Sequence, residues 1–428
     1  MNYGGSGTNG KLGMSQQVNQ STSDMLVNPY GERQLIVIGN GFDLACGLKS
    51  SYTDFFSPRL DKANSIKDSN EEEWRKVVDD EGLTVWDFIL RLGIGGPDWC
   101  NLEKVIGDWV LPTVTGGEHD EKQDGMPIAD QLLDILDLPV FQRNPPRIDE
   151  ATDRVVHKLT TEFELLLRDV ARCVWHRAGY KAGQGMNRSQ LLAFLLAELH
   201  VVEERFRGYL IGQSANAGRY LNDAVATLGD MTWDGLTRAE EREYDKASTS
   251  VLSFNYTTPF IYSNRIVDEA NVVNIHGKLD GEIVFGVDGK ECMSDLDALP
   301  FTKTYRVASM GVKMGDPLYD TVSGGIGWSK TTTIRFFGHS LGEADYSYFQ
   351  SIFDGVNLYG GSTKLVFYFR SWPGKDEEEL HAETVRSVTK LLTTYGATLD
   401  NRDHGKNLMH KLLLEGRLEV KRLMKRVW

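Results

Sequence analysis

The feature that most constrains the fold of this chain is an apolar segment, residues 35–38, that runs directly into a glycine turn and the start of a helix. Its sequence, Leu-Ile-Val-Ile, is typical of a buried parallel strand. Gly39 and Gly41 lack a Cβ, so the backbone can turn sharply and the N–H groups of residues 40–43 can face an anion at the positive end of the helix. The segment predicts a phosphate site; the alternative is a strand-to-helix turn without a ligand.

The glycine pattern differs from the dehydrogenase fingerprint G-x-G-x-x-G, because Leu44 occupies the position of the third glycine. No acidic residue about 20 positions further on closes an evident second strand. A hydride-transfer enzyme is therefore disfavoured.

Composition and charge exclude several classes of protein. The 428 residues are 41% hydrophobic and 25% charged, as expected of a globular protein. We expect a cytoplasmic protein without membrane contact, because no apolar run reaches the roughly 18 residues that span a bilayer and no signal peptide is evident. The net charge of −14 disfavours nucleic-acid binding. The four cysteines form no C-x-x-C pair, so neither a disulfide framework nor a cysteine-bound zinc is expected, and we predict no metal.

Strand-like and helix-like segments alternate in a way that predicts an α/β fold. Residues 1–32, rich in Gly, Ser and Asn, are expected to be a disordered or cloning-derived tail. Residues 33–56 and 246–400 are expected to form a parallel Rossmann sheet. Residues 57–245 contain only helix-like segments, at 70–92, 128–136, 151–176 and 189–228, and predict a large helical insertion between the first strand and the rest. Residues 401–428, where Lys and Arg interleave with Leu, are expected to form a C-terminal amphipathic helix.

The residues that follow the expected strands are those placed to bind a ligand, because ligands of open parallel sheets lie beyond the carboxyl ends of the strands. Glycines, an amide, an imidazole and a hydroxyl are found there, in the segments 39–43, 255–257, 276–277 and 338–341. The sequence therefore predicts that four strand ends meet at one crevice. The expected strands after the first are 250–254, 272–275, 282–286, 332–337 and 364–369.

The glycine turn resembles the nucleotide loop of sirtuins, G-A-G-[IF]-S-x-x-x-G-[IL]-P-D-F. Gly39, Gly41 and Gly47 have the same mutual spacing, and Asp43 stands where sirtuins have serine. The full segment GNGFDLACGLKSSYTDF, together with Trp-Cys-Asn-Leu-Glu at 99–103, resembles the AbiH family, bacterial proteins linked to abortive phage infection.

Three later segments are similar to sirtuin motifs in the same order along the chain. Ser-Phe-Asn-Tyr at 253–256, Ile-His-Gly at 275–277 and Gly-His-Ser-Leu at 338–341 correspond to T-Q-N-[IV]-D, the catalytic H-G and G-T-S-L. Thr257 departs from the sirtuin aspartate, and the four-cysteine zinc ribbon of sirtuin deacylases is missing, which argues against protein deacylation. The resemblances imply a sirtuin-like pocket that hydrolyses NAD to nicotinamide and ADP-ribose, stopping an infected cell before phage mature.

This resemblance assigns chemical roles to three side chains. His276, with an unperturbed pKa of about 6.5, is expected to accept a proton near neutral pH. Asn255 has both a donor and an acceptor with which to orient water or a ribose hydroxyl. Asp43 is expected to stabilise developing positive charge. The nucleotide is expected to lie against Gly39, Asn40, Gly41, Phe42, Gly338, His339 and Ser340.

Other functions compete with this interpretation. A non-catalytic sensor of NAD or ADP-ribose would use the same glycines but not His276. Gly-His-Ser-Leu-Gly at 338–342 also spells the nucleophile elbow of α/β-hydrolases, with Ser340 as nucleophile and a histidine further on as base, from His381, His404 and His410. A nuclease would need a carboxylate cluster or basic groove that the sequence does not display. Expected partners are NAD or a related adenine nucleotide, a phage-derived activator or partner protein, and a second copy of the chain.

Overall fold

A computed structural model describes the protein over the ranges 33–66, 69–91, 102–111, 113–115, 123–125, 127–136, 162–179, 185–260, 266–288, 295–310, 331–371 and 374–425. The expected tail, 1–32, lies outside these described residues. So do Trp99 and Cys100 of the AbiH-like segment.

A six-stranded, all-parallel sheet organises the fold, which confirms the expected α/β class. Its spatial order is β5-β4-β1-β6-β7-β8. Along the chain, β4 and β5 are added on one side of β1, and β6, β7 and β8 are then added on its other side. The direction of building reverses between β1 and β6. The strands are β1 (Arg33–Ile38), β4 (Thr249–Ser253), β5 (Val272–Asn274), β6 (Thr331–Phe337), β7 (Lys364–Phe369) and β8 (Leu418–Arg422).

Helices cover both faces of this sheet, as a parallel sheet requires. One face packs against α13 (Tyr346–Gly355), α14 (Glu377–Gly396) and α15 (Arg402–Leu414). The other packs against α1 (Asn40–Ala45) and α10 (Tyr220–Thr232). Successive residues of β1 alternate between the two cores, since Leu35 and Val37 belong to the first and Ile36 and Ile38 to the second. The apolar run in β1 is therefore explained by burial on both sides.

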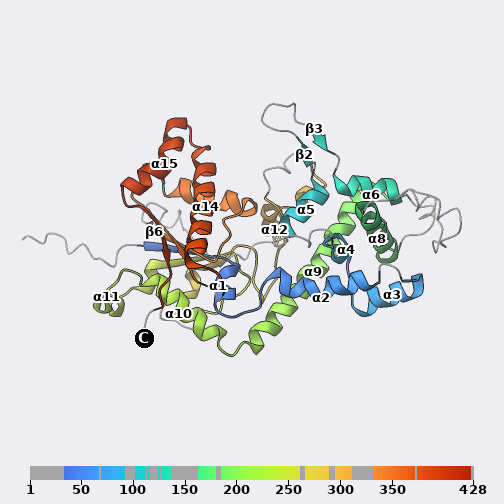
Figure 1. Cartoon of the computed structure of the whole chain (residues 1–428), viewed down its shortest axis with the longest axis horizontal. Helices are drawn as coiled ribbons and strands as arrows, with labels where there is room; N and C mark the ends of the chain where they lie inside the picture. The colour runs from blue at the N-terminus through green and yellow to red at the C-terminus, as the bar shows by residue number, and fades with distance from the viewer. Residues whose placement is uncertain are drawn as a thin grey trace, which may run out of the picture.

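A second core, built almost wholly of helices, lies to one side of the sheet (Figure 1). The long helix α9 runs along it, and aromatic residues fill much of its interior. Five residues that follow β5 in the chain also belong to this core: Ile283, Phe285, Val287, Ala298 and Phe301. Its helices are α2 (Tyr52–Ser65), α3 (Glu71–Asp80), α4 (Val85–Ile89), α5 (Leu102–Val110), α6 (Ile128–Leu136), α8 (Glu162–Arg177) and α9 (Arg188–Asn216).

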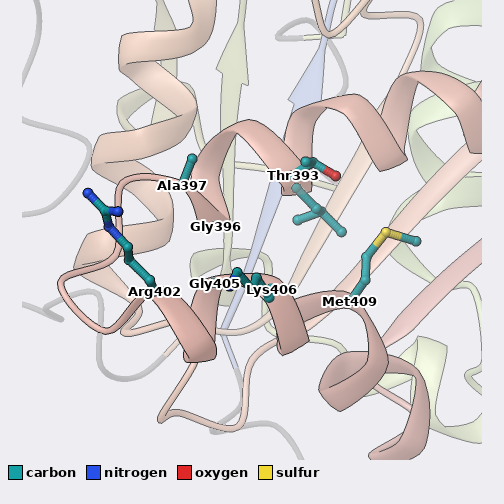
Figure 2. Close-up of a pocket in the computed structure, with 8 residues that line it drawn as sticks. Thr393, Gly396, Ala397, Arg402, Gly405, Lys406 and Met409 are labelled. Atoms are coloured by element: carbon teal, nitrogen blue, oxygen red, sulfur yellow. The ribbon is translucent and has the colours of Figure 1, made fainter.

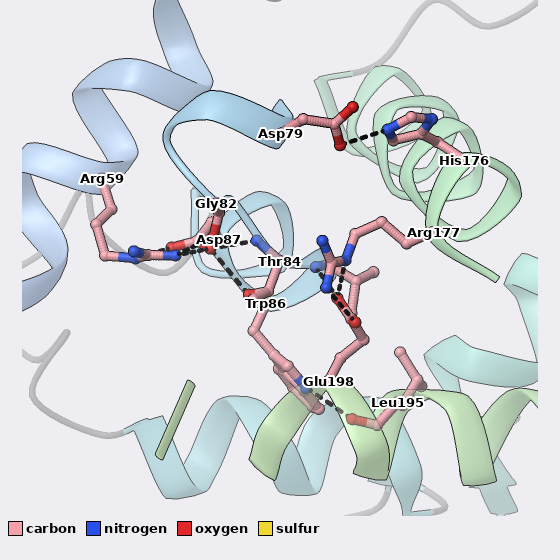
Figure 3. A network of polar contacts seen from close by, with 11 residues as sticks. Arg59, Asp79, Gly82, Thr84, Trp86, Asp87, His176, Arg177, Leu195 and Glu198 are labelled. Atoms are coloured by element: carbon pink, nitrogen blue, oxygen red, sulfur yellow. Dashed lines mark hydrogen bonds and ion pairs between the residues drawn. The ribbon is translucent and has the colours of Figure 1, made fainter. Parts of the chain in front are cut away.

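Buried ion pairs fix how these helices cross (Figure 3). Arg59 of α2 donates from Nε and Nη2 to the two carboxylate oxygens of Asp87, each at 2.6 Å. Asp87 also caps its own helix by accepting from the Thr84 N–H at 2.6 Å. Arg177 of α8 pairs with Glu198 of α9 through the same two nitrogens, at 2.5 and 2.8 Å. These charges are paired and hydrogen-bonded, the condition under which burial is tolerated.

The C-terminal segment corrects one expectation, because 401–428 is not a single helix. The helix α15 ends at Leu414. Gly416 follows it with a left-handed φ of 66°, a conformation that terminates a right-handed helix. The chain then forms β8, which pairs with β7 as the last strand of the sheet. Leu418 and Val420, two residues apart, contribute to the core of the sheet, so the apolar pattern there has the period of a strand.

Other boundaries also differ from those expected. Residues 282–286 do not form a strand; Ile283 makes only an isolated bridge to Gly277. The expected helix 189–228 is interrupted between α9 and α10. The helix α10 falls within the expected insertion but packs on the sheet. A short antiparallel hairpin, β2 (Thr113–Thr115) with β3 (Gln123–Gly125), interrupts the helical region. The remaining short helices are α11 (Arg238–Arg242) and α12 (Lys303–Ser309), with 3-10 turns η3 (Lys246–Ser248), η4 (Glu269–Asn271), η6 (Leu299–Phe301) and η8 (Glu343–Asp345).

Candidate functional site

The two glycine segments meet where the sheet reverses direction. Gly41 N–H donates to Gly338 O at 2.7 Å, and Gly39 N–H donates to Phe337 O at 3.2 Å. A Cβ on Gly338, whose φ is 72°, would lie 2.1 Å from Phe42 N. Only glycine permits this backbone approach. The amide of Gly41 is consequently used within the protein rather than offered to a ligand.

Asp43 is a buried carboxylate held by hydroxyl groups. Its side chain is 2% exposed and accepts hydrogen bonds from Tyr220 at 2.7 Å and Thr257 at 2.6 Å. Burial raises the pKa of Asp43 to about 6, although Thr257, Tyr220 and the nearby Asn255 amide favour the carboxylate. At pH 7 the group therefore carries a negative charge that only neutral donors stabilise.

Asn255 lies beside Asp43, close enough for its side-chain amide to favour the carboxylate. Neither Oδ1 nor Nδ2 has a hydrogen-bond partner among the described residues, and the residue is 4% exposed. Its backbone is well held: Asn274 Nδ2 donates to Asn255 O at 2.7 Å and to Thr257 O at 3.1 Å. A buried primary amide without a well-formed hydrogen bond costs free energy.

His276 follows β5 and is fully surrounded by protein. Burial, and then the nearby Lys303, lowers the pKa of His276 to about 3. Its Nε2 lies 3.5 Å from Asp345 Oδ1 and makes no hydrogen bond within the described part of the chain. The expectation that this imidazole titrates near neutral pH is therefore wrong for this form of the protein, because desolvation keeps it neutral.

Lys303 and Asp345 occupy the centre of the site. The Lys303 ammonium, 2% exposed, lies 2.7 Å from Asp345 Oδ1 and 2.6 Å from Glu103 Oε1. Burial by itself would raise the pKa of Asp345, but Lys303, His339 and His276 lower it well below its usual range. Burial also works to lower the pKa of Lys303, yet Glu103 and Asp345 together raise it. Lys303 thus joins the helical core to the sheet.

His339 completes the cluster on the β6 side. Its Nδ1 accepts from the Leu341 N–H at 2.9 Å, so the ring proton is on Nε2, which lies 3.3 Å from Asp345 Oδ2. The Phe254 ring packs edge-on against His339 and His276, with centroid distances of 4.3 and 5.5 Å. The two histidines are therefore held on either side of one carboxylate.

The expected site residues divide into two groups. Asp43 and Asn255 lie together, and His276 and His339 flank Asp345, whereas Asn40 and Ser340 are exposed at the rim. The left-handed φ expected of a strained nucleophile falls on Leu341 (57°) rather than Ser340. Within the described ranges, none of His381, His404 and His410 hydrogen-bonds to Ser340, so the elbow interpretation gains no support.

Sequence reasoning missed Lys303, Asp345 and Tyr220, and gave Glu103 no role in the site. Asp345 follows the 338–342 motif by three residues and could have been found as the nearest carboxylate to that strand end. Lys303 carries no such signal, since it is the first residue of the short helix α12 and follows no strand. Only the folded chain brings Glu103 to it.

In the described part of the chain, no three His, Cys, Asp or Glu side chains are grouped as metal ligands. No helix there combines the length and apolarity needed to cross a bilayer.

The comparisons with known proteins give one match. Residues 35–368 match the family described as "Bacteriophage abortive infection AbiH", which includes both glycine segments and every residue of the site. No curated protein and no solved structure matches the chain.

Proposed function

This chain belongs to the AbiH family of bacteriophage abortive infection proteins, and we propose that it is a cytoplasmic NAD glycohydrolase whose substrate binds between Gly39 and Ser340. Family membership indicates a role in abortive infection. The observation that carries the proposal is the buried pair Asp43 and Asn255 at the point where the sheet reverses. In the described part of the chain, no cation pairs with this carboxylate and neither polar atom of the amide makes a well-formed hydrogen bond.

The topology supports a nucleotide ligand. Counted along the chain, the sheet strands have the order 3-2-1-4-5-6, the order of Rossmann dinucleotide-binding sheets. In such sheets the ligand binds at the reversal, here between β1 and β6. Asn40 and Ser340 are the exposed polar residues at this rim, and the pyrophosphate of NAD would lie against them. The sirtuin-like order of motifs is consistent with the same pocket.

The site residues fit the chemistry of NAD hydrolysis. The bond between ribose C1′ and the nicotinamide nitrogen breaks with its electron pair going to the nicotinamide, water adds to C1′, and one proton is released. The ribose becomes positively charged in the transition state, which the Asp43 carboxylate stabilises. Asn255 orients the water or a ribose hydroxyl.

The pKa values of the buried groups assign the role of general base to Asp43 and not to His276. With a pKa of about 6, Asp43 is better matched than His276 to accept the proton of the attacking water near neutral pH. His276, neutral and aimed at Asp345, orients the substrate instead. All three side chains are buried, so substrate entry requires the crevice to open.

The test is to incubate the purified full chain with NAD and follow nicotinamide release by chromatography, with and without lysate from infected cells. We expect release by the wild type, loss of release in Asp43→Asn, and a pH profile that falls below about pH 6 as Asp43 is protonated. Asp61→Asn, a change at an exposed carboxylate, is the control. Release that is unchanged in Asp43→Asn would contradict the assignment.

A second candidate function is a nucleotide sensor that signals through a partner without catalysis. The burial of His276, with a pKa of about 3, favours it, because such an imidazole is a poor base. Under this proposal His276→Ala retains NAD or ADP-ribose binding, and no nicotinamide is released under any condition. In either case we propose that a phage-derived activator or a second copy of the chain opens the crevice through the helical core, which reaches the site through Glu103 and Lys303.

A further inference from the structure

A cavity of about 450 Å³ lies at the carboxyl ends of β7 and β8, apart from the site described above. Arg370 and Ser371 follow β7, Lys425 follows Arg422 at the end of β8, and Ala45 closes it at the last residue of α1. Of the described residues that line it, three are cationic and none is acidic. This is a local reversal of charge in a protein of net charge −14.

Arg370 lines this cavity, and one edge of its guanidinium has no hydrogen-bond partner among the described residues. Its side chain is 12% exposed, and its Nη1 donates to Thr227 at 3.2 Å. Nε and Nη2 are buried and have no hydrogen-bond partner among the described residues. The nearest acid, Asp230, lies 3.6 Å from Nη2, which is too far for a hydrogen bond. Arg422 is less available because it pairs with Glu377 at 2.7 Å.

Two other arginines of this protein show how the Nε and Nη2 edge of a guanidinium binds an acid. Nε and Nη2 form the side of the guanidinium that matches two oxygens of one acid. Arg59 and Arg177 both use this edge to bind a carboxylate bidentately (Figure 3). Arg370 has comparable burial, since the side chains of Arg59 and Arg177 are 15% and 21% exposed. It differs in that its carboxylate neighbour, Asp230, lies at ion-pair distance, 3.6 Å from Nη2, and accepts no hydrogen bond from this edge.

We infer that this cavity binds the phosphate group of a small phosphorylated molecule, with Arg370 Nε and Nη2 donating to two phosphate oxygens. Lys425 adds positive charge at the rim. Because Nε and Nη2 are buried and Asp230 lies 3.6 Å from Nη2, phosphate binding requires the guanidinium to turn towards the cavity. The volume lies within the range of small-molecule sites and accommodates more than a bare phosphate ion. None of these residues is assigned to NAD hydrolysis, so the inference is independent of the proposed function.

A calorimetric titration of the full chain with inorganic phosphate, at constant ionic strength set with chloride, tests the inference. We expect saturable binding that Arg370→Lys weakens by at least about tenfold, because lysine keeps the charge but not the two parallel hydrogen bonds. A parallel titration with ADP separates the sources: tighter binding of ADP indicates a nucleoside phosphate, and binding of phosphate alone indicates the free ion. Either titration supports the inference if Arg370→Lys lowers the affinity for the ligand used in it.

The control is the same substitution in another cavity. Arg402 and Lys406 line a cavity of about 390 Å³ between α14 and α15, where Gly396 and Gly405 bring the helices together (Figure 2). Both cations are exposed there, and no buried guanidinium edge is left without a partner in the described part of that cavity. Arg402→Lys should leave phosphate affinity within about twofold of the wild type.

Equal affinity in the wild type and Arg370→Lys, or no saturable binding at matched ionic strength, would overturn the inference. Thermal unfolding of the unliganded variants checks that each is folded. If Arg370→Lys does not fold, crystals of the wild type soaked in tungstate provide the test. An anomalous peak within hydrogen-bonding distance of Arg370 Nε supports the site, and a peak only elsewhere, or none, refutes it. The titration involves no NAD, so its failure leaves nicotinamide release untouched.

Discussion

At the scale of single residues, glycine is required where the β1 turn meets the end of β6. Gly338 has a φ of 72°, and a Cβ added to it would lie only 2.1 Å from Phe42 N. We predict that Gly338→Ala lowers the free energy of unfolding by about 3 kcal/mol or more, from backbone strain plus steric overlap. Gly416→Ala, at φ 66° in open space, should cost only about 1–2 kcal/mol. Urea unfolding compares them, and equal losses would contradict the close approach.

Asp43 makes the stability of the protein depend on pH. Its pKa rises from 3.8 to about 6 on folding, so the folded state holds the proton more tightly than the unfolded chain. The protonated carboxyl therefore stabilises the folded state fully below about pH 4, by about 3 kcal/mol of unfolding free energy. This contribution is lost as the pH rises through about 6. The difference in unfolding free energy between Asp43→Asn and wild type should shift in favour of the variant by about 1.4 kcal/mol between pH 5 and 7.5. A pH-independent difference would show that Asp43 is not desolvated.

The sequence indicated which segments carry polar groups, but not which polar groups touch. Asp43 and Asn255 were both expected at strand ends, and they do lie together. The neutral state of His276 could not be predicted, because it depends on burial and on Lys303, which belongs to a different element. Tyr220, which donates to Asp43, is separated from it by 177 residues. Contacts of this kind follow from tertiary packing and leave no local pattern.

At the scale of elements, one lysine connects the helical core to the sheet. Lys303 of α12 bridges Glu103 of α5 and Asp345 of η8. Lys303→Met should lower the unfolding free energy by about 3–5 kcal/mol, because two carboxylates lose their buried counter-ion. It should also raise the pKa of His276, since the cation that helps to lower it is gone.

Chemical denaturation and a histidine NMR titration measure these two effects. Lys62→Met is the matched control, because Lys62 pairs with Glu81 on the surface and should cost less than about 1 kcal/mol. Similar losses in both variants would mean that the Lys303 bridge carries no particular stability.

Elements with a strong local pattern were predicted well. The segments 364–369 and 128–136 were expected as a strand and a helix, and β7 and α6 have those bounds. The strand β8 was missed although Leu418 and Val420 alternate with Glu419 and Lys421 as in a strand, because the preceding helix α15 made a continuous amphipathic helix plausible. Its place in the sheet is fixed by pairing with β7, a long-range contact.

At the scale of the whole molecule, the sheet and the helical core share the site rather than dividing it. The sheet supplies Asp43, Asn255, His276 and His339, and the helical side supplies Glu103. An activator that moves the helical core would act directly on the Lys303 bridge and on access to the buried side chains. The family match spans both parts, as this shared site requires.

The most direct test of the central claim is a calorimetric titration of NAD into the Asp43→Asn variant, which should not hydrolyse it, with and without Asn255→Leu. We predict saturable binding of NAD whose affinity falls by at least about tenfold on Asn255→Leu, because leucine has a similar shape but cannot make the hydrogen bonds of the Asn255 amide. Unfolding profiles confirm that both variants are folded. Binding of equal strength in the two proteins, or no saturable binding of NAD at all, would contradict a nucleotide site at the reversal of the sheet.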